Sequence, residues 1–269
     1  MSTEREYRLQ RAIVYTVVTL LALPLAGTLV YSLAETWGAT ILPDGFTCKW
    51  YLQLWSDPRF LLAFARSLGV CLGALALGTL IIVPAVFAIQ YYFPALDRVM
   101  NALILLPFAI PPVVSSVGLL NLYADGPLPL VGTPWVLLGC YFTVALPFMY
   151  RALTDSLRLL AVRDLIDAAH LLGASLPRAF VSVILPNIRN GLAASLFVSL
   201  TFLMGEFVFA NMLVGTRYET LQIYLYNMRS TSGHFTSALV ISYFLFTFAL
   251  TWTTARLNSK NPPSHEGRS

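Results

Sequence analysis

Glu206 is the residue of this chain best placed to do chemistry in apolar surroundings. It stands in the sequence F-L-M-G-E-F-V-F-A-N-M, slightly past the middle of a long apolar run. A carboxylate near the centre of a bilayer costs about 2.5–3.5 kcal/mol on insertion scales, so its side chain should face protein or water. It could line a pathway and attract a cationic solute, or it could bond to neighbouring helices and hold them together. Asn211, further along the same run, is open to the same two interpretations.

No arrangement of residues in the sequence supports catalysis. The phosphate-binding pattern G-x-x-x-x-G-K-[ST] is missing, so we expect no ATP hydrolysis by this chain. No nucleophile stands near a base with a supporting motif, and the connecting segments are too short for a catalytic domain. The three cysteines show no pairing pattern; Cys71 and Cys140 lie inside apolar runs, as packing residues do. We therefore expect no catalytic residue, no metal site and no cofactor.

The most informative polar stretch runs from Arg163 to Pro186 and reads R-D-L-I-D-A-A-H-L-L-G-A-S-L-P-R-A-F-V-S-V-I-L-P. Its first half has apolar residues at helical spacing, namely Leu165, Ala168, Ala169 and Leu172. Gly173 suits the left-handed position that ends a helix. Ser175 is placed to cap a second helix, with Pro177 in its first turn. Two short helices joined at a glycine would form a compact knob that could dock into a cleft on another protein.

This stretch resembles the E-A-A loop of the membrane subunits of binding-protein-dependent ABC importers. The pattern of that loop is Glu-Ala-Ala, three residues, Gly, nine residues, Ile, one residue and Leu-Pro. The matching residues are Asp167, Ala168, Ala169, Gly173, Val183, Leu185 and Pro186. The departures are Asp for Glu and Val for Ile. The alternative interpretation is an ordinary amphipathic loop.

The composition is that of a membrane protein. Hydrophobic residues make up 57% of the 269 residues and charged residues 11%, against about 25% charged in soluble domains. Mean hydropathy is +0.71. Apolar runs long enough to cross a bilayer predict an all-α protein with six transmembrane helices. These lie at about 12–33, 67–93, 101–123, 134–150, 188–213 and 237–255.

The spans define one membrane domain, 12–255, flanked by polar tails at 1–11 and 256–269. The loop from 151 to 186 contains the E-A-A-like stretch. The segment 34–66 is predicted to be a loop whose later part is amphipathic. Its aromatic residues, which suit the membrane–water interface, are Trp50, Tyr51 and Trp55.

The third span cannot be a regular helix, because it contains Pro107, Pro111 and Pro112. Broken backbone at membrane depth is tolerated only where it is buried in protein or lines a wet cavity. Ser115 and Ser116 follow after two valines. We expect these residues to line a pathway, and the alternative is a purely structural kink.

Basic residues predict the orientation. An even number of spans puts both termini on one side of the membrane, and 12 basic residues fall on that side against 5 on the other. The larger set is Arg5, Arg8, Arg11, Arg98, Arg151, Arg158, Arg163, Arg178, Arg189, Arg256, Lys260 and Arg268. The positive-inside rule then places the termini and the loop 151–186 in the cytoplasm.

The resemblance implies a MetI-like permease fold in the bacterial inner membrane. It also implies that a pair of ATPase subunits grips the loop helices of two permease subunits, while a solute-binding protein docks on the outer side. ATP hydrolysis would then occur on the separate ATPase subunits, and closure of that pair would move the helix that contains Asp167. The second permease is expected to be a different chain, because the resembling polyamine systems pair two distinct permeases. Membrane lipid is the other expected partner, and nucleic acid is not.

Weaker similarities concern the solute. The segment I-L-P-D-G-F-T with the following Trp50-Tyr51, together with M-G-E-F around Glu206, resembles permeases for spermidine and putrescine. Systems for 2-aminoethylphosphonate, iron(III) and thiamine are close alternatives. Two other classes of protein are alternatives. A secondary transporter usually shows a duplicated half and coupling-ion carboxylates, which this chain lacks. A membrane scaffold would need neither three prolines in one span nor the long motif loop.

Overall fold

The computed structural model describes residues 2–38, 40, 42–125 and 127–259. The chain divides into two compact units. Unit 1 comprises Met1–Leu61 and Leu225–Phe246, and unit 2 comprises Leu62–Tyr224 and Thr247–Ser269. The predicted tail at 256–269 begins as the end of a helix, and its residues 260–269 lie outside the described part.

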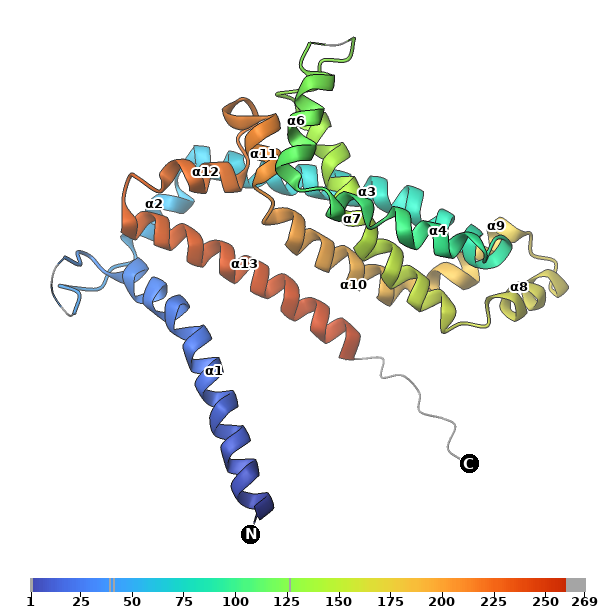
Figure 1. Ribbon diagram of the computed structural model, residues 1–269, viewed down its shortest axis with the longest axis horizontal. Coiled ribbons are helices and arrows are strands. Elements are labelled where there is room, and N and C mark those ends of the chain that lie inside the picture. Colours follow the sequence, from blue (N-terminus) through green and yellow to red (C-terminus); the bar gives the residue numbers. More distant parts are fainter. Residues whose placement is uncertain (1, 39, 41, 126, 260–269) are drawn as a thin grey trace. The chain divides into compact units, whose positions relative to one another are not determined.

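The apolar runs of the sequence form helices (Figure 1). Within the described part of the chain, five helical segments are long and apolar enough to cross a membrane. They are α1 (Ser2–Leu33), α3 (Pro58–Tyr92), α7 (Pro134–Arg158), the continuous run Leu176–Met204 and α13 (Gly233–Ser259). The sixth span is a bent pair, in which Leu96–Ala109 contains α4 (Leu96–Leu103) and α5 (Leu106–Ala109) and meets α6 (Pro112–Tyr123) at 88°. The predicted six-span, all-helical architecture is therefore confirmed, with several boundaries moved.

The bend in the third span has a local cause. Ile110 and Pro111 each precede a proline, which pushes a residue out of the helical region. Both are accordingly extended, with ψ angles of 123° and 136°. Because Pro111 and Pro112 lack an N–H, they could not have continued the hydrogen-bond ladder of α5. The chain restarts as α6, where the Ser116 hydroxyl donates to the Pro112 carbonyl at 2.8 Å.

Unit 1 is organised around the end of α1. The predicted loop 34–66 is wrong in part, because it contains α2 (Lys49–Trp55) and the first turns of α3. Trp50 Nε1 donates to the Ala34 carbonyl at 2.8 Å, and the Tyr51 hydroxyl lies 2.6 Å from Ser32 Oγ. The ring of His234 stacks on Tyr31 with centroids 4.1 Å apart. The aromatic residues thus join α2 and the start of α13 to the end of α1.

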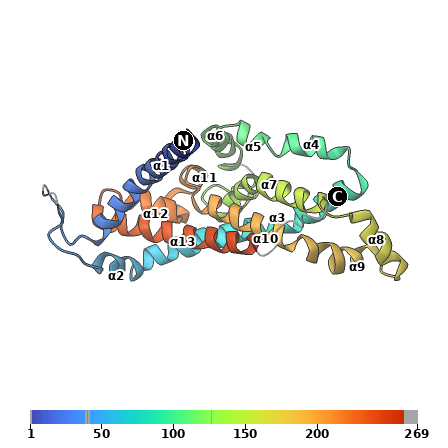
Figure 2. The ribbon, with the colours of Figure 1, turned by 90° about the horizontal axis from the view of Figure 1, so that it is seen from below.

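The core of unit 2 is built by α3, α7 and α10 (Leu185–Met204). Helices α7 and α10 run side by side in both ribbon views (Figures 1 and 2). Small residues allow their backbones to approach, since a Cβ added at Gly191 would overlap Ser156 Oγ. Gly78 of α3 likewise lies against Met149 of α7. Tyr150, Leu153 and Ile188 are fully buried between these helices.

The contact between α7 and α10 predicts a stability effect. Gly191→Ala should lower the unfolding free energy by about 1–3 kcal/mol, because an added methyl group overpacks a tight contact. A lower apparent melting temperature in detergent would reveal it. Adding Ser156→Ala should recover most of the loss, since the overlapping hydroxyl is then removed. Gly69→Ala is the matched control, because nothing lies within 4 Å of a Cβ at that position. Equal effects of the two glycine substitutions would contradict the close approach.

Candidate functional site: a coupling loop and a membrane cavity

The loop that resembles the E-A-A motif is a helix closed by a glycine turn. Helix α8 (Val162–Leu171) ends where Gly173 takes a φ of +81°, as predicted. The Ala174 N–H donates to Ala169 O at 3.0 Å, and the Gly173 N–H donates to His170 O at 2.9 Å. This pair of bonds is the Schellman arrangement, which satisfies the last carbonyls of a helix.

The second helix of the loop is longer than predicted. Ser175 occupies the N-cap position of α9 (Leu176–Ala179), although its side chain makes no capping bond. Helix α9 then continues through a π-helical turn, Phe180–Ile184, into α10 and ends only at Met204. The wider π turn ends at Ile184, two residues before Pro186, which cannot donate the regular bond. The predicted start of the fifth span at residue 188 was therefore too late.

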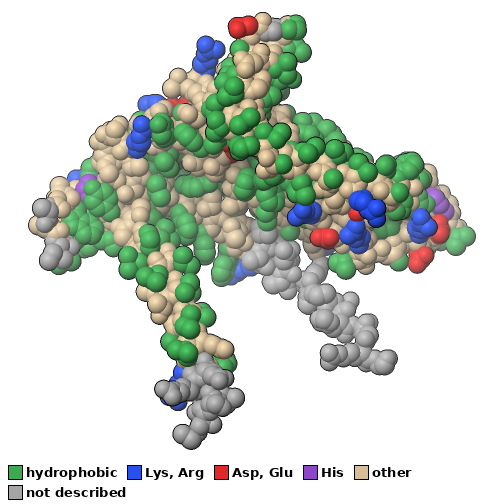
Figure 3. Space-filling model, viewed as in Figure 1, with side chains coloured by type: hydrophobic (Ala, Val, Ile, Leu, Met, Phe, Trp, Pro, Cys, Tyr) green, Lys and Arg blue, Asp and Glu red, His purple; other side chains and the backbone are tan. Residues whose placement is uncertain are grey.

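The two faces of α8 differ from the prediction. Ile166 and Ala169 are buried, whereas Ala168 is exposed together with Asp167. Leu171 and Leu172, at the tip of the loop, are 90% and 89% exposed. Of the remaining motif residues, Leu185 is half-buried and Pro186 is exposed. Figure 3 shows charged side chains gathered around this end of unit 2. The tip of the loop thus presents two exposed leucine side chains near charged residues. The helical spacing did not predict this exposure.

The carboxylate of Asp97 anchors α7, the helix that leads into this loop. Asp97, at the start of α4, accepts hydrogen bonds from four side chains on three helices. The donors are Gln90 of α3 at 2.9 Å, Asn101 of α4 at 3.1 Å, and Tyr150 and Arg158 of α7 at 2.9 and 2.6 Å. Arg158 ends α7, so the cluster anchors α7 where the motif loop begins. Sequence patterns contained no signal for it, because its members are far apart along the chain.

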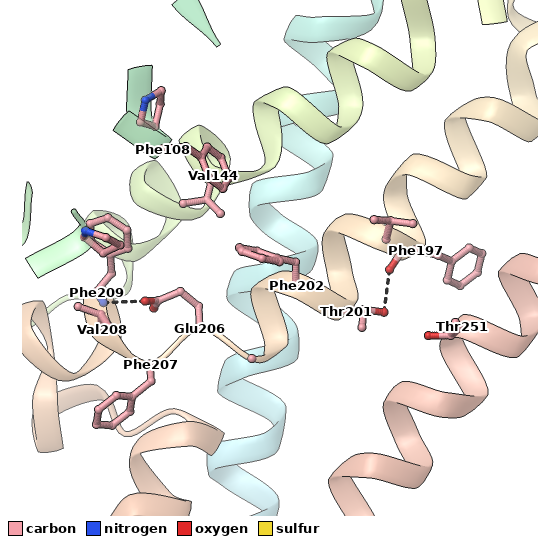
Figure 4. Close-up of a pocket in the computed structure, with 14 residues that line it drawn as sticks. Phe108, Val144, Phe197, Thr201, Phe202, Glu206, Phe207, Val208, Phe209 and Thr251 are labelled. Atoms are coloured by element: carbon pink, nitrogen blue, oxygen red, sulfur yellow. Dashed lines mark hydrogen bonds between the residues drawn. The ribbon is translucent and has the colours of Figure 1, made fainter. Parts of the chain in front are cut away.

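Glu206 lies in a break rather than inside a helix. The predicted span 188–213 is interrupted, since α10 ends at Met204 and α11 (Val208–Leu213) begins after Phe207. The Glu206 carboxylate accepts the N–H group of Phe209 at 2.8 Å (Figure 4) and that of Ala210 at 3.2 Å. It therefore caps α11, which otherwise would begin with unbonded N–H groups. On the other side of the break, Gln222 Nε2 donates to the Met204 carbonyl at 3.0 Å.

A hollow of about 970 Å³ adjoins this break within unit 2. Among the described residues that line it, Glu206 is the one ionisable side chain, and the others are mostly aromatic or aliphatic (Figure 4). They are Pro107, Phe108, Pro112, Val144, Phe197, Val198, Thr201, Phe202, Gly205, Phe207, Val208, Phe209 and Thr251. A cavity of this size with few polar groups is typical of a site for a small molecule.

Of the other predicted pathway residues, the structure brings only some to this hollow. Pro112 lines it, and Ser115 lines a neighbouring hollow of about 680 Å³. Ser116 is fully buried, and Pro111 forms the bend of the third span. Asn211 is exposed on α11 and lines neither hollow. The phenylalanines of the lining were missed, because phenylalanine is common in all the apolar runs.

The buried cysteines match their predicted packing role, since Cys71 and Cys140 are enclosed in unit 2. Among the residues that the structure describes, no group of three or more His, Cys, Asp or Glu side chains could hold a metal ion.

Comparison with known proteins gives a consistent result. Residues 78–261 match the family described as "Binding-protein-dependent transport system inner membrane component". The spermidine/putrescine transport system permease protein PotC of Escherichia coli K12 is 31% identical over 189 residues, which is 69% of each chain. PhnV of Salmonella typhimurium, a permease protein provisionally assigned to a 2-aminoethylphosphonate transport system, is 29% identical over 207 residues, or 77% of each chain.

Two solved structures share the fold. One is the MetNI methionine ABC transporter in inward-facing conformations, with a TM-score of 0.59 and 17% identity over 77% of this chain and 100% of that one. The other is a bacterial ABC transporter involved in the import of the acidic polysaccharide alginate, with a TM-score of 0.63 and 15% identity over 98% of each chain. This chain therefore belongs to the inner membrane components of binding-protein-dependent transport systems, the permease subunits of ABC importers.

Proposed function

We propose that this permease conducts small solutes that carry a primary aliphatic ammonium group. Spermidine and putrescine are the first candidates and 2-aminoethylphosphonate is the second, in keeping with the names of the two relatives. Both kinds of solute end in an ammonium group on a short flexible chain. The observation that supports this class best is the lining of the hollow, where Phe197, Phe202, Phe207 and Phe209 gather. Aromatic faces attract ammonium groups in sites shielded from water.

The importer assembly follows from the family. We infer that the complete transporter contains two ATPase subunits, a solute-binding protein and a second permease that is a different chain. It would lie in the bacterial inner membrane with the loop 151–186 in the cytoplasm, as the distribution of basic residues favours. The exposed side chains of Leu171 and Leu172 would enter a cleft on the ATPase, since exposed apolar side chains beside charged residues are typical of protein–protein contact sites.

Glu206 has a structural role in this proposal. Both of its carboxylate oxygens already accept backbone N–H groups, so the carboxylate is engaged at the start of α11. A capped helix start keeps the break between α10 and α11 intact next to the solute. Selection among solutes would then depend on the solute-binding protein and on the aromatic lining, instead of on a free negative charge in the membrane.

ATP-driven uptake tests the proposal directly. Proteoliposomes that contain this chain with its ATPase, partner permease and binding protein should accumulate spermidine, putrescine or 2-aminoethylphosphonate only when ATP is supplied to the ATPase side. Gly173→Val should abolish uptake and capture of the ATPase, because a β-branched residue at positive φ costs roughly 1–3 kcal/mol of strain at the docking turn.

Two variants control this experiment. Gly173→Asn should retain uptake, since asparagine tolerates positive φ. Gly215→Val introduces the same strain at a φ of +51° in the other polar loop and should leave ATPase capture unchanged. Uptake of iron(III) or thiamine alone would refute the ammonium class. Unimpaired ATPase capture by Gly173→Val would refute the docking role of the loop.

The capping role of Glu206 makes a separate prediction. Glu206→Ala should lower the apparent melting temperature and reduce uptake of every solute, since a lost N-cap costs about 0.5–2 kcal/mol. Glu206→Gln should keep most of both, because an amide oxygen can still accept one N–H. Asn211→Ala is the control on the same short helix. If Glu206→Gln melted normally but raised KM for spermidine alone, the carboxylate would be a solute-binding group instead.

A further inference from the structure

A further hollow of unit 2, of about 450 Å³, lies between α5, α7 and α10. Five apolar side chains form most of its wall, namely Leu105, Phe108, Pro147, Phe148 and Val198. Arg151 and Asp155 are the charged side chains among the described residues that line it. The hollow therefore combines an apolar slot with one positive and one negative group.

The two charges of this hollow are not neutralised by the protein. Arg151 and Asp155 stand one turn apart on α7, at a spacing where opposite charges often pair. Within the part of the chain that the structure describes, neither forms an ion pair, and both residues are exposed. Arg158 of the same helix is by contrast held by Asp97 at 2.6 Å. Two opposite charges without partners can hold the two ends of a zwitterion.

The position of Arg151 along α7 matches the level of lipid headgroups. The helix begins at Pro134, and Arg151 is its first charged residue. At 1.5 Å per residue the two are about 26 Å apart, close to the thickness of about 30 Å of the hydrocarbon core. Pro147 and Phe148 of the apolar wall lie one turn nearer the middle of the span. The charges thus stand at the membrane surface, and the slot faces the acyl chains.

We propose that this hollow binds a phospholipid with a phosphoethanolamine headgroup. The phosphate would contact Arg151, the ammonium would contact Asp155, and the upper part of an acyl chain would enter the apolar slot. A guanidinium binds phosphate through two parallel N–H···O bonds, and a carboxylate accepts hydrogen bonds from a primary ammonium. The proposal depends on the membrane location of this chain and not on which solute it conducts.

The spacing of the two charges fits this headgroup. Residues four apart on a helix have Cβ atoms about 5–6 Å apart, and the phosphate and ammonium of phosphoethanolamine are joined by only two carbons. Phosphatidylglycerol could give its phosphate to Arg151, but it has no cation for Asp155. The acyl chain leaves one apolar environment for another, so it adds little affinity. Selection among lipids would therefore depend on the headgroup.

A free aminoethylphosphonate carries the same two charges as this headgroup. It has no hydrocarbon chain that could occupy the slot formed by the five apolar side chains. The phospholipid accounts for both the charges and the apolar wall, and the experiment below distinguishes the two ligands.

Native mass spectrometry of the assembled transporter tests the site. The complex in detergent is equilibrated with an equimolar mixture of phosphatidylethanolamine and phosphatidylglycerol whose chains differ in mass. The parent complex should retain phosphatidylethanolamine in preference. Arg151→Gln should reduce its retention on the order of tenfold, the effect of losing one hydrogen bond between charged groups. Asp155→Asn should instead abolish the preference between the two lipids, because the carboxylate is the group that distinguishes them.

One variant and one lipid control this experiment. Arg189→Gln should retain the parent's preference, because Arg189 is an exposed arginine of α10 that does not line the hollow. Phosphatidylcholine should be retained less than phosphatidylethanolamine, since its quaternary ammonium has no N–H to donate to Asp155. Copurified ATPase confirms assembly of each variant.

Three results would overturn the lipid site. The parent complex could retain the two lipids equally. Arg151→Gln could retain as much phosphatidylethanolamine as Arg189→Gln does. Finally, free 2-aminoethylphosphonate could displace the lipid at micromolar concentration, which would assign the pair of charges to the solute instead.

Discussion

The need to bond every backbone N–H and C=O group inside an apolar medium governs the functional part of this molecule. A helix that stops within a membrane exposes such groups at its end, and each unsatisfied one costs several kcal/mol. The break after Met204 is nevertheless bonded on both sides. Glu206 accepts two N–H groups of α11, and Gln222 donates to the last carbonyl of α10. With these bonds the chain can turn beside a cavity and still remain inside the membrane domain.

The bend of the third span, at Pro111 and Pro112, meets the same requirement for bonded backbone groups in a different way. Pro111 and Pro112 have no N–H to leave unbonded, so the 88° bend leaves fewer unbonded donors. Both interruptions border the hollow of about 970 Å³. Irregular backbone at membrane depth is expected where it lines a cavity, and the two breaks define where a solute could be held. The helices between them, α7 and α10, remain regular and pack closely enough to act as one body.

Much of the architecture could be predicted from local sequence patterns. Apolar run length indicated the spans, prolines indicated the bend, and Gly173 with its neighbours indicated the turn of the coupling loop. These features depend on residues close together in the chain. Span boundaries were less accurate, because an apolar run does not show where a helix continues into a polar loop. Helix α7 extends to Arg158 in this way, and the helical run that contains α10 begins at Leu176.

The site itself depends on contacts that no local pattern contains. Glu206 was recognised as unusual, but its capping role requires knowing that the helix breaks beside it. The Asp97 cluster joins α3, α4 and α7, and the rings of Phe108, Phe148 and Phe202 come together from α5, α7 and α10. Phenylalanine in an apolar span is indistinguishable from ordinary core or lipid-facing residues, so only the fold shows which rings meet. The exposure of Leu171 and Leu172 at the loop tip could likewise not be predicted, since the same spacing of apolar residues suits a buried helix face.

The continuous helical run Leu176–Met204 joins the coupling loop to the cavity, so movement of the loop should displace the cavity lining, and a distance measurement can show this. Spin labels at Leu106 and Val198, both exposed side chains of unit 2, would report the separation of α5 from α10 in the assembled transporter. Pulsed electron resonance with ADP and with ATP should give two distinct distances, since movement of the loop displaces α10 relative to α5. A single, unchanged distance in a transporter that hydrolyses ATP and imports solute would contradict this coupling between the loop and α10.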